Sequence, residues 1–236
     1  MTNVVWNFVV GAFAICAATG LAGCGKTEAP KDAVPAKEVT ELRPSIAVQA
    51  DQSTTGDENI TADPQAMMAF LNQTYKDPLF TWHDTTGSLI TVSTEASNVP
   101  GKPALLITPT SAESRHLVGL TVPGAGKATT YNVKMWVKAE PPAGVMVELA
   151  SGKKYGFEYF DIGKGIVVNS SSNADTKLRD VKIALDKGWT LITFSFAAPD
   201  GRVIFNIGAT VGGGHTFKGR SKYAITLGGI VIEPAA

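Results

Sequence analysis

From residue 80 onward, apolar and polar positions alternate with a period of two, in short runs rich in β-branched and aromatic residues. Clusters of Gly, Pro, Asn and Asp separate the runs, and this pattern is typical of β-strands with one buried face. The candidate strands are residues 89–94, 104–108, 116–122, 131–139, 145–149, 155–161, 165–169, 181–184, 190–197, 202–207 and 223–232. So many strands in one domain predict an all-β sandwich.

A short helix is predicted ahead of these strands. Asp63 is a suitable N-cap, Pro64 suits the first helical position, and an apolar run follows. The helix should end before Asp77, which precedes another proline. Its apolar residues are Met67, Met68, Phe70 and Leu71. We expect this apolar face to cover the edge or the end of a sheet.

The N-terminus carries an uncharged, mostly apolar run over residues 4–22, closed by Leu21-Ala22-Gly23-Cys24. This tetrapeptide resembles the lipobox of bacterial lipoproteins, which implies that residues 1–23 are a cleaved signal peptide and that Cys24 carries a lipid. Gly25 is not Asp, and in Gram-negative lipoproteins that implies the outer membrane, facing either the periplasm or the exterior. The alternative is an uncleaved membrane anchor, because about 20 apolar residues span a bilayer.

Residues 24–60 are rich in Pro, Ala, Lys, Glu and Thr and show no sustained periodicity, so we expect a flexible tether. A flexible chain of that length spans roughly 30–35 Å. Residues 61–236 then form one sandwich domain, long enough to bury a core of its own.

Composition excludes several classes of protein. The 21 Lys and Arg balance the 21 Asp and Glu, and no basic block occurs, which argues against nucleic-acid binding. The only two cysteines, Cys16 and Cys24, lie in the N-terminal segment, so the domain has no disulfide and depends on its hydrophobic core.

Several segments carry a family resemblance. They read YNVKMWVKA at 131–139, FDIGKGIV at 160–167 and GWTL at 188–191, and the closing strand at 223–233 ends in an apolar residue and Glu. In this order they resemble the jelly-roll sandwiches of carbohydrate-binding modules and related domains of bacterial and phage surface proteins. The resemblance implies a jelly-roll fold and makes glycan binding one expected function, although such sandwiches also serve adhesion and scaffolding.

The candidate ligand-binding residues lie on the strand at 131–139. Alternation places Asn132, Lys134 and Trp136 on its polar face, where an indole ring could stack on the apolar face of a sugar while its neighbours bond the hydroxyls. Burial of Trp136 by another element is the alternative. Trp189 opens a later strand and is a second candidate, although a packing role at the strand end suits it better.

Other aromatic and acidic residues are expected to be structural. Tyr155, Phe157 and Tyr159 alternate in phase, which is more typical of a core stripe than of a site. Glu148 and Glu158 could form a glycosidase pair only if they faced one cleft. Because no nucleophile motif or histidine metal motif occurs, we expect no enzyme. No cofactor is expected, although a structural calcium is possible at loop carboxylates, namely Asp161, Asp175, Asp180 and Asp200.

Two functional hypotheses follow. The first is a non-catalytic, lipid-anchored envelope protein that binds cell-wall or surface polysaccharide through the face around Trp136. The second is a structural or docking subunit of an envelope protein assembly that does not bind sugar.

Overall fold

A computed structural model describes residues 63–123, 128–171, 176–198 and 202–236. The predicted signal peptide, Cys24 and the tether lie outside these residues. The elements are α1 (Pro64–Thr74), β1 (Thr81–Asp84), β2 (Ser88–Val92), β3 (Leu105–Pro109), β4 (Glu113–Ser114), β5 (Leu117–Val122), β6 (Thr129–Ala139), β7 (Ala143–Ser151), β8 (Lys154–Asp161), β9 (Ile166–Ser171), β10 (Arg179–Asp186), β11 (Trp189–Ala198), β12 (Val203–Val211), β13 (Phe217–Lys218), a 3-10 turn (Ser221–Tyr223) and β14 (Ile225–Pro234).

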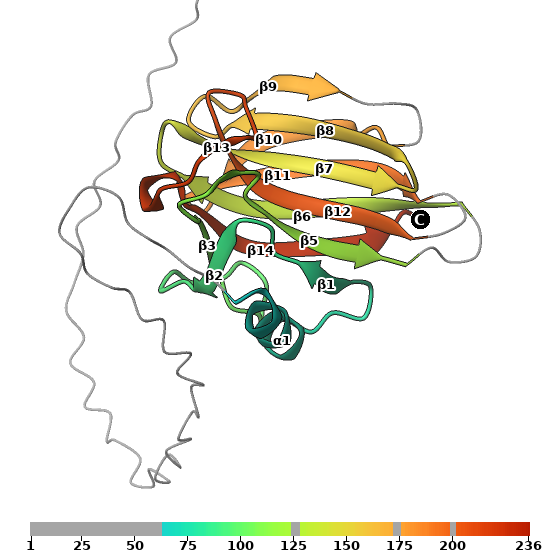
Figure 1. Ribbon diagram of the computed structural model, residues 1–236. Coiled ribbons are helices and arrows are strands. Elements are labelled where there is room, and N and C mark those ends of the chain that lie inside the picture. The colour runs from blue at the N-terminus through green and yellow to red at the C-terminus, as the bar shows by residue number, and fades with distance from the viewer. Residues whose placement is uncertain (1–62, 124–127, 172–175, 199–201) are drawn as a thin grey trace, which may run out of the picture. The chain divides into compact units, whose positions relative to one another are not determined.

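Two six-stranded antiparallel sheets form the domain (Figure 1). Sheet A has the strand order β1-β5-β12-β7-β8-β9, and sheet B has the order β10-β11-β6-β14-β3-β2. The two-residue strands β4 and β13 pair separately. The predicted all-β jelly-roll sandwich is therefore confirmed.

The core lies between the two sheets, and the period of two along the strands determines which side chains enter it. On β6, Tyr131, Val133, Met135 and Val137 are at most 4% exposed. Phe194 of sheet B stacks on Phe205 of sheet A, with ring centroids 5.7 Å apart. The alternation predicted for β6 is therefore confirmed.

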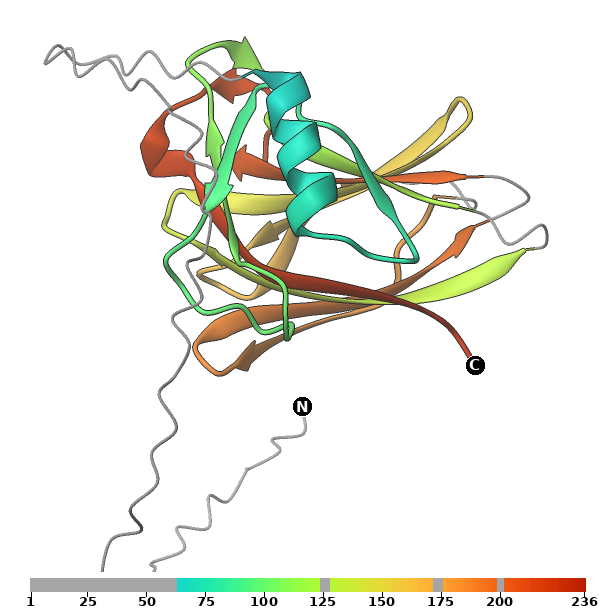
Figure 2. The same cartoon turned by 90° about the horizontal axis from the view of Figure 1, so that it is seen from below.

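The helix α1 begins and ends close to where the sequence predicts. Its N-cap Asp63 accepts hydrogen bonds from the N–H groups of Gln65 and Ala66, at 2.9 and 3.3 Å. Met67 and Leu71 are buried, and the helix lies along one side of the sandwich (Figure 2). The predicted role of its apolar face, to cover a sheet edge, is confirmed.

Three short strands were not predicted: β1, β4 and β13. Strands of two to four residues offer too few positions for alternation to show. Trp82 lies in β1 and is 3% exposed, with its ring against Tyr75 and Phe80 at centroid distances of 5.5 and 5.6 Å. Within the described part of the chain, none of the helices has the length and apolarity to cross a membrane.

Candidate functional site

Residues of five strands form a row across the outward side of sheet A, the side that faces away from the core. The strand register aligns Gly119 of β5, Asn206 of β12, Glu148 of β7, Phe157 of β8 and Ser171 of β9. Because neighbouring strands lie about 4.8 Å apart, the row is about 19 Å long. We call this side of the sheet face A.

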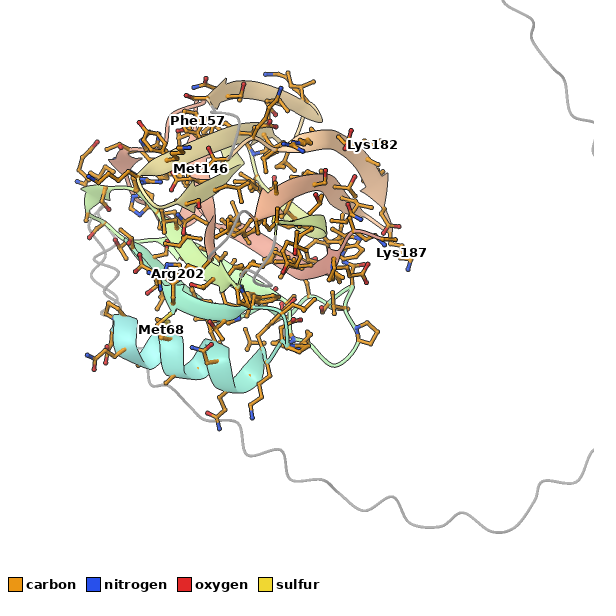
Figure 3. The ribbon with its side chains drawn as sticks, turned by 90° about the vertical axis from the view of Figure 1, so that its right-hand side faces the viewer. Met68, Met146, Phe157, Lys182, Lys187 and Arg202 are labelled. Carbon is orange, nitrogen blue, oxygen red and sulfur yellow. The ribbon has the colours of Figure 1, made fainter. Side chains whose placement is uncertain are left out.

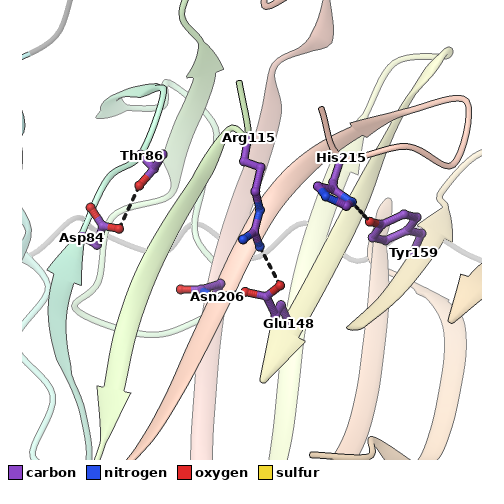
Figure 4. A network of polar contacts seen from close by, with 7 residues as sticks. All are labelled: Asp84, Thr86, Arg115, Glu148, Tyr159, Asn206 and His215. Atoms are coloured by element: carbon purple, nitrogen blue, oxygen red, sulfur yellow. Dashed lines mark hydrogen bonds and ion pairs between the residues drawn. The ribbon is translucent and has the colours of Figure 1, made fainter. Parts of the chain in front are cut away.

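A polar network lies in the middle of face A (Figure 4). Arg115 Nη2 bonds Glu148 Oε2 at 2.6 Å, and Asn206 Nδ2 donates to Glu148 Oε1 at 2.8 Å. Glu148 and Asn206 are each 8% exposed, whereas the Arg115 side chain is 37% exposed. Both carboxylate oxygens are therefore held in place, and part of the guanidinium faces solvent.

Gly119 gives this network room. A Cβ at this position would lie 2.5 Å from His83 Cε1 and 2.7 Å from Asn206 Oδ1, so only glycine lets both side chains lie over β5.

Burial lowers the pKa of His83 below its usual 6.5, and the charge of Arg202 lowers it further, against the opposite effect of Asp84. His83 is therefore neutral at pH 7.

The aromatic stripe of β8 also lies on face A, outside the core between the sheets. Tyr159 is buried, at 1% exposed, as expected of a core stripe, whereas Tyr155 at the other end is not. Phe157 and Tyr159 stack at a centroid distance of 4.6 Å and join a separate apolar cluster with Leu117 and Met146. Tyr155 is 61% exposed. The alternation was correctly recognised, but it does not say which face of a sheet is covered.

Histidine and tyrosine meet at one end of the stripe. The Tyr159 hydroxyl bonds His215 Nδ1, and His215 lies after a turn that contains three glycines. Burial raises the pKa of Tyr159 to about 12, so the phenol keeps its proton. Arg115, Asn206 and His215 are distant from one another along the chain, so no sequence pattern predicts that Arg115, Asn206 or His215 belongs to a site.

The predicted ligand-binding residues lie together on the outward side of sheet B, which we call face B. Asn132 and Lys134 are exposed, and Trp136 is half-buried. Trp136 Nε1 donates to Asp186 Oδ2 at 2.7 Å, which fixes the ring orientation. Figure 3 shows Met146 and Phe157 of sheet A on one side of the sandwich and Lys182 and Lys187, from β10 and the turn after it, on the other.

Trp189 lies on face B as well, but its ring is packed. It is 5% exposed, and a Cβ added to Gly228 would lie 2.6–2.7 Å from three of its ring atoms. Lys138 Nζ lies 4.3 Å from the ring centroid. The indole is therefore covered by Gly228 and Lys138.

The two glutamates considered as a catalytic pair lie on opposite sides of sheet A. Glu148 is aligned with Phe157, whereas Glu158 is aligned with Val147 of the core. Burial raises the pKa of Glu158. Side chains on opposite faces of one sheet cannot act on one glycosidic bond.

The loop carboxylates have protein partners where the structure describes them. Asp161 accepts from Lys164, at 2.9 Å from its ammonium group, which lowers the pKa of this carboxyl. Asp180 accepts from Ser195 at 3.2 Å. Asp175 and Asp200 lie outside the described residues. Within those residues, no cluster of three His, Cys, Asp or Glu side chains could hold a metal ion.

No protein-family model matches this chain, and no curated protein matches its sequence at a significant level. Among solved structures, it is similar to the CBM22-1 and GH10 modules of Clostridium thermocellum xylanase 10B in complex with xylohexaose, at 13% identity and a TM-score of 0.35, over 67% of this chain and 29% of that one. The tailspike protein 4 of bacteriophage CBA120 matches at 12% identity and a TM-score of 0.34, over 69% of this chain and 20% of that one. TmCBM61 in complex with β-1,4-galactotriose matches at 15% identity and a TM-score of 0.26, over 60% of this chain and 93% of that one.

Proposed function

We propose that this protein is a non-catalytic, glycan-binding protein of the cell envelope and that face A binds the glycan. One observation carries the proposal. The exposed ring of Tyr155 and the half-buried ring of Phe157 lie on the same face of β8, beside the Arg115–Glu148–Asn206 network. A sugar ring has an apolar C–H face that can stack on an aromatic ring, and hydroxyls that need donors and acceptors. Face A offers both kinds of group.

The register of β7 and β8 supports stacking at Tyr155. Ala150, a small residue, lies opposite Tyr155, and Tyr155 is 61% exposed. Phe157 lies two residues along the strand, about 7 Å away. Two rings at this spacing can contact successive sugars of an extended chain.

The fixed polar groups favour face A over face B. Glu148 is held by Arg115 and Asn206 before any ligand arrives, so binding orders few side chains. On face B, the single N–H donor of Trp136 is already bonded to Asp186, and Lys134 and Asn132 are exposed at the surface. The predicted role of Trp136 remains a competing proposal for the same function.

Lipid attachment at Cys24 and residence in the outer membrane complete the proposal. They rest on the lipobox resemblance. An envelope docking subunit without sugar binding is the alternative function.

The test is retention of the full chain, in mild detergent, on purified cell-wall and surface polysaccharides. We expect wild type and Trp136→Ala to be retained and Tyr155→Ala to be lost. Val92→Ala is the matched control, because Val92 is also an exposed apolar residue on a strand, at 51%, but belongs to sheet B.

The outcomes separate the alternatives. Loss with Trp136→Ala and retention with Tyr155→Ala would move the site to face B. Failure of wild type to bind any polysaccharide would overturn glycan binding and favour the docking subunit. Thermal unfolding of each variant shows whether a loss reflects misfolding.

A further inference from the structure

The two sides of the sandwich are closed in different ways. On one side, α1 covers the edge strands of both sheets (Figures 1 and 2). Asn72 bonds both backbone groups of Trp82 in β1, at 3.0 and 3.1 Å. The N–H of Ile90 in β2 donates to Met67 Sδ at 3.4 Å. Helix side chains thus occupy edge positions where another strand could otherwise pair.

The opposite side carries the edge strands β10 and β9. On β10, Arg179, Asp180, Lys182 and Asp186 add charge, and the pairing register shifts between Arg179 and Lys182. Charges and irregular pairing are the usual protection of a sheet edge. Of the four edges of the two six-stranded sheets, which are β1, β9, β10 and β2, only β9 has neither charged residues nor a covering helix.

The exposed side chains of β9 are apolar at its start. Ile166, Val167 and Val168 are 47%, 41% and 43% exposed. Val167 is aligned with the core residue Phe160, yet it stays exposed because sheet A ends at β9. With Leu185 of β10, at 82%, these residues are four of the six exposed large apolar side chains of the described chain.

We propose that β9 is a dimerisation edge and that its partner is β9 of a second copy of this chain, paired antiparallel about a two-fold axis at Val167. This inference is independent of glycan binding. In this register Val167 faces Val167 of the second copy, and Ile166 faces Val168 of the second copy. The apolar triplet then packs on itself, and the edge backbone groups complete an antiparallel ladder.

Charge favours a second copy as the partner. Residues 166–171 contain no charge, so two copies meet without like-charge repulsion across the strands. The nearest charge, Lys164, bonds Asp161 of its own chain at 2.9 Å and would lie opposite Ser170 of the second copy. A two-fold interface of this kind is the commonest form of homodimer.

The extent of β9 limits the strength of the interface. Val168 has no partner in the β8 register, which runs from Phe160–Val167 to Tyr159–Asn169, so the regular ladder is short. A short strand pair buries little area, and we therefore expect a dimer that dissociates on dilution.

Disulfide trapping tests the proposal directly. Cys16 and Cys24 are the only cysteines, so the full chain with Cys16→Ser and Cys24→Ser contains none. A Val167→Cys substitution should then form an intermolecular disulfide on mild oxidation, because directly opposed residues place their Cβ atoms about 5 Å apart. Val92→Cys is the matched control: it is also exposed and lies on the edge strand β2.

We expect at least tenfold more trapped dimer with Val167→Cys than with Val92→Cys, and a lower yield on dilution. Equal yields from the two variants, or no dimer with Val167→Cys, would overturn the proposal. A mixture of Ile166→Cys and Val168→Cys chains provides a second test that does not alter Val167. It should give the mixed dimer in preference to either homodimer, and the absence of this preference would contradict the register.

Discussion

Face A and face B are built on the same alternation but differ in what holds their polar groups. On face A, residues from β7, from β12 and from the segment before β5 fix one another through a largely buried carboxylate. On face B, Trp136 has one bond to Asp186, and its neighbours Asn132 and Lys134 are exposed. A surface that retains a buried charge network is costly to build, which makes face A the better candidate for a selected function.

We expect the largest difference in stability between substitutions of the two tryptophans of face B. Trp189→Ala removes a packed ring that is 5% exposed and should lower the free energy of unfolding by about 3 kcal/mol. Trp136→Ala removes a half-buried ring and one hydrogen bond and should cost about 1 kcal/mol. Urea unfolding of both variants gives the comparison. Equal losses would mean that Trp136 is a packing residue as well.

The next largest difference in stability should be between variants of the polar groups on the two faces. Glu148→Ala leaves Arg115 and Asn206 without their partner and should destabilise the domain by about 2 kcal/mol, because Asn206 is 8% exposed. On face B, Asp186→Ala removes only the partner of Trp136 and should cost about 1 kcal/mol. If Asp186→Ala proved as costly as Glu148→Ala, face A would no longer be the more tightly built surface.

Gly119 allows face A to be perturbed without touching the core. Gly119→Ala places a methyl group against His83 and Asn206 and should destabilise the domain by about 1 kcal/mol. Retention on polysaccharide should fall with it. Gly163→Ala is the control, because its nearest contacts would be at 3.5 and 3.6 Å, in ordinary van der Waals range. Unchanged retention with Gly119→Ala would separate the network from ligand binding.

The smallest effect should be a pH dependence that originates on face A. The folded pKa of His83 is lower than its usual 6.5, so the unfolded state binds more protons as the pH falls through this value. Stability that His83 contributes at pH 7 is therefore lost toward pH 5. We expect a shallower loss of stability over this range in His83→Gln than in wild type, measured by urea unfolding at each pH. Parallel curves would show that His83 is not the source.

Much of the fold could be predicted from local patterns. The β6 alternation identified its buried residues, because side chains of a strand alternate between two faces whatever the neighbouring strands are. Asp63 and Pro64 identified the start of α1, because capping depends on residues within one turn. The short strands β1, β4 and β13 were missed, since two to four residues are too few for alternation to show.

The candidate site shows the other limit. Trp136 could be recognised as outward-facing from its own strand, and this placement holds. The Tyr155 stripe has the same alternation, but it was assigned to the core because the phase of one strand does not say which face meets the other sheet. Likewise, Arg115, Glu148 and Asn206 meet only through the pairing of β12 with β5 and β7.

The sequence by itself determined the β-rich character of the domain, the helix start and the two-faced pattern of its strands, because these depend on neighbours within a few residues. The tertiary structure decided which aromatic face is turned outward, which residues share a polar network and which sheet edge is left uncovered. Those features depend on strand order and register, and contacts between residues distant along the chain fix both.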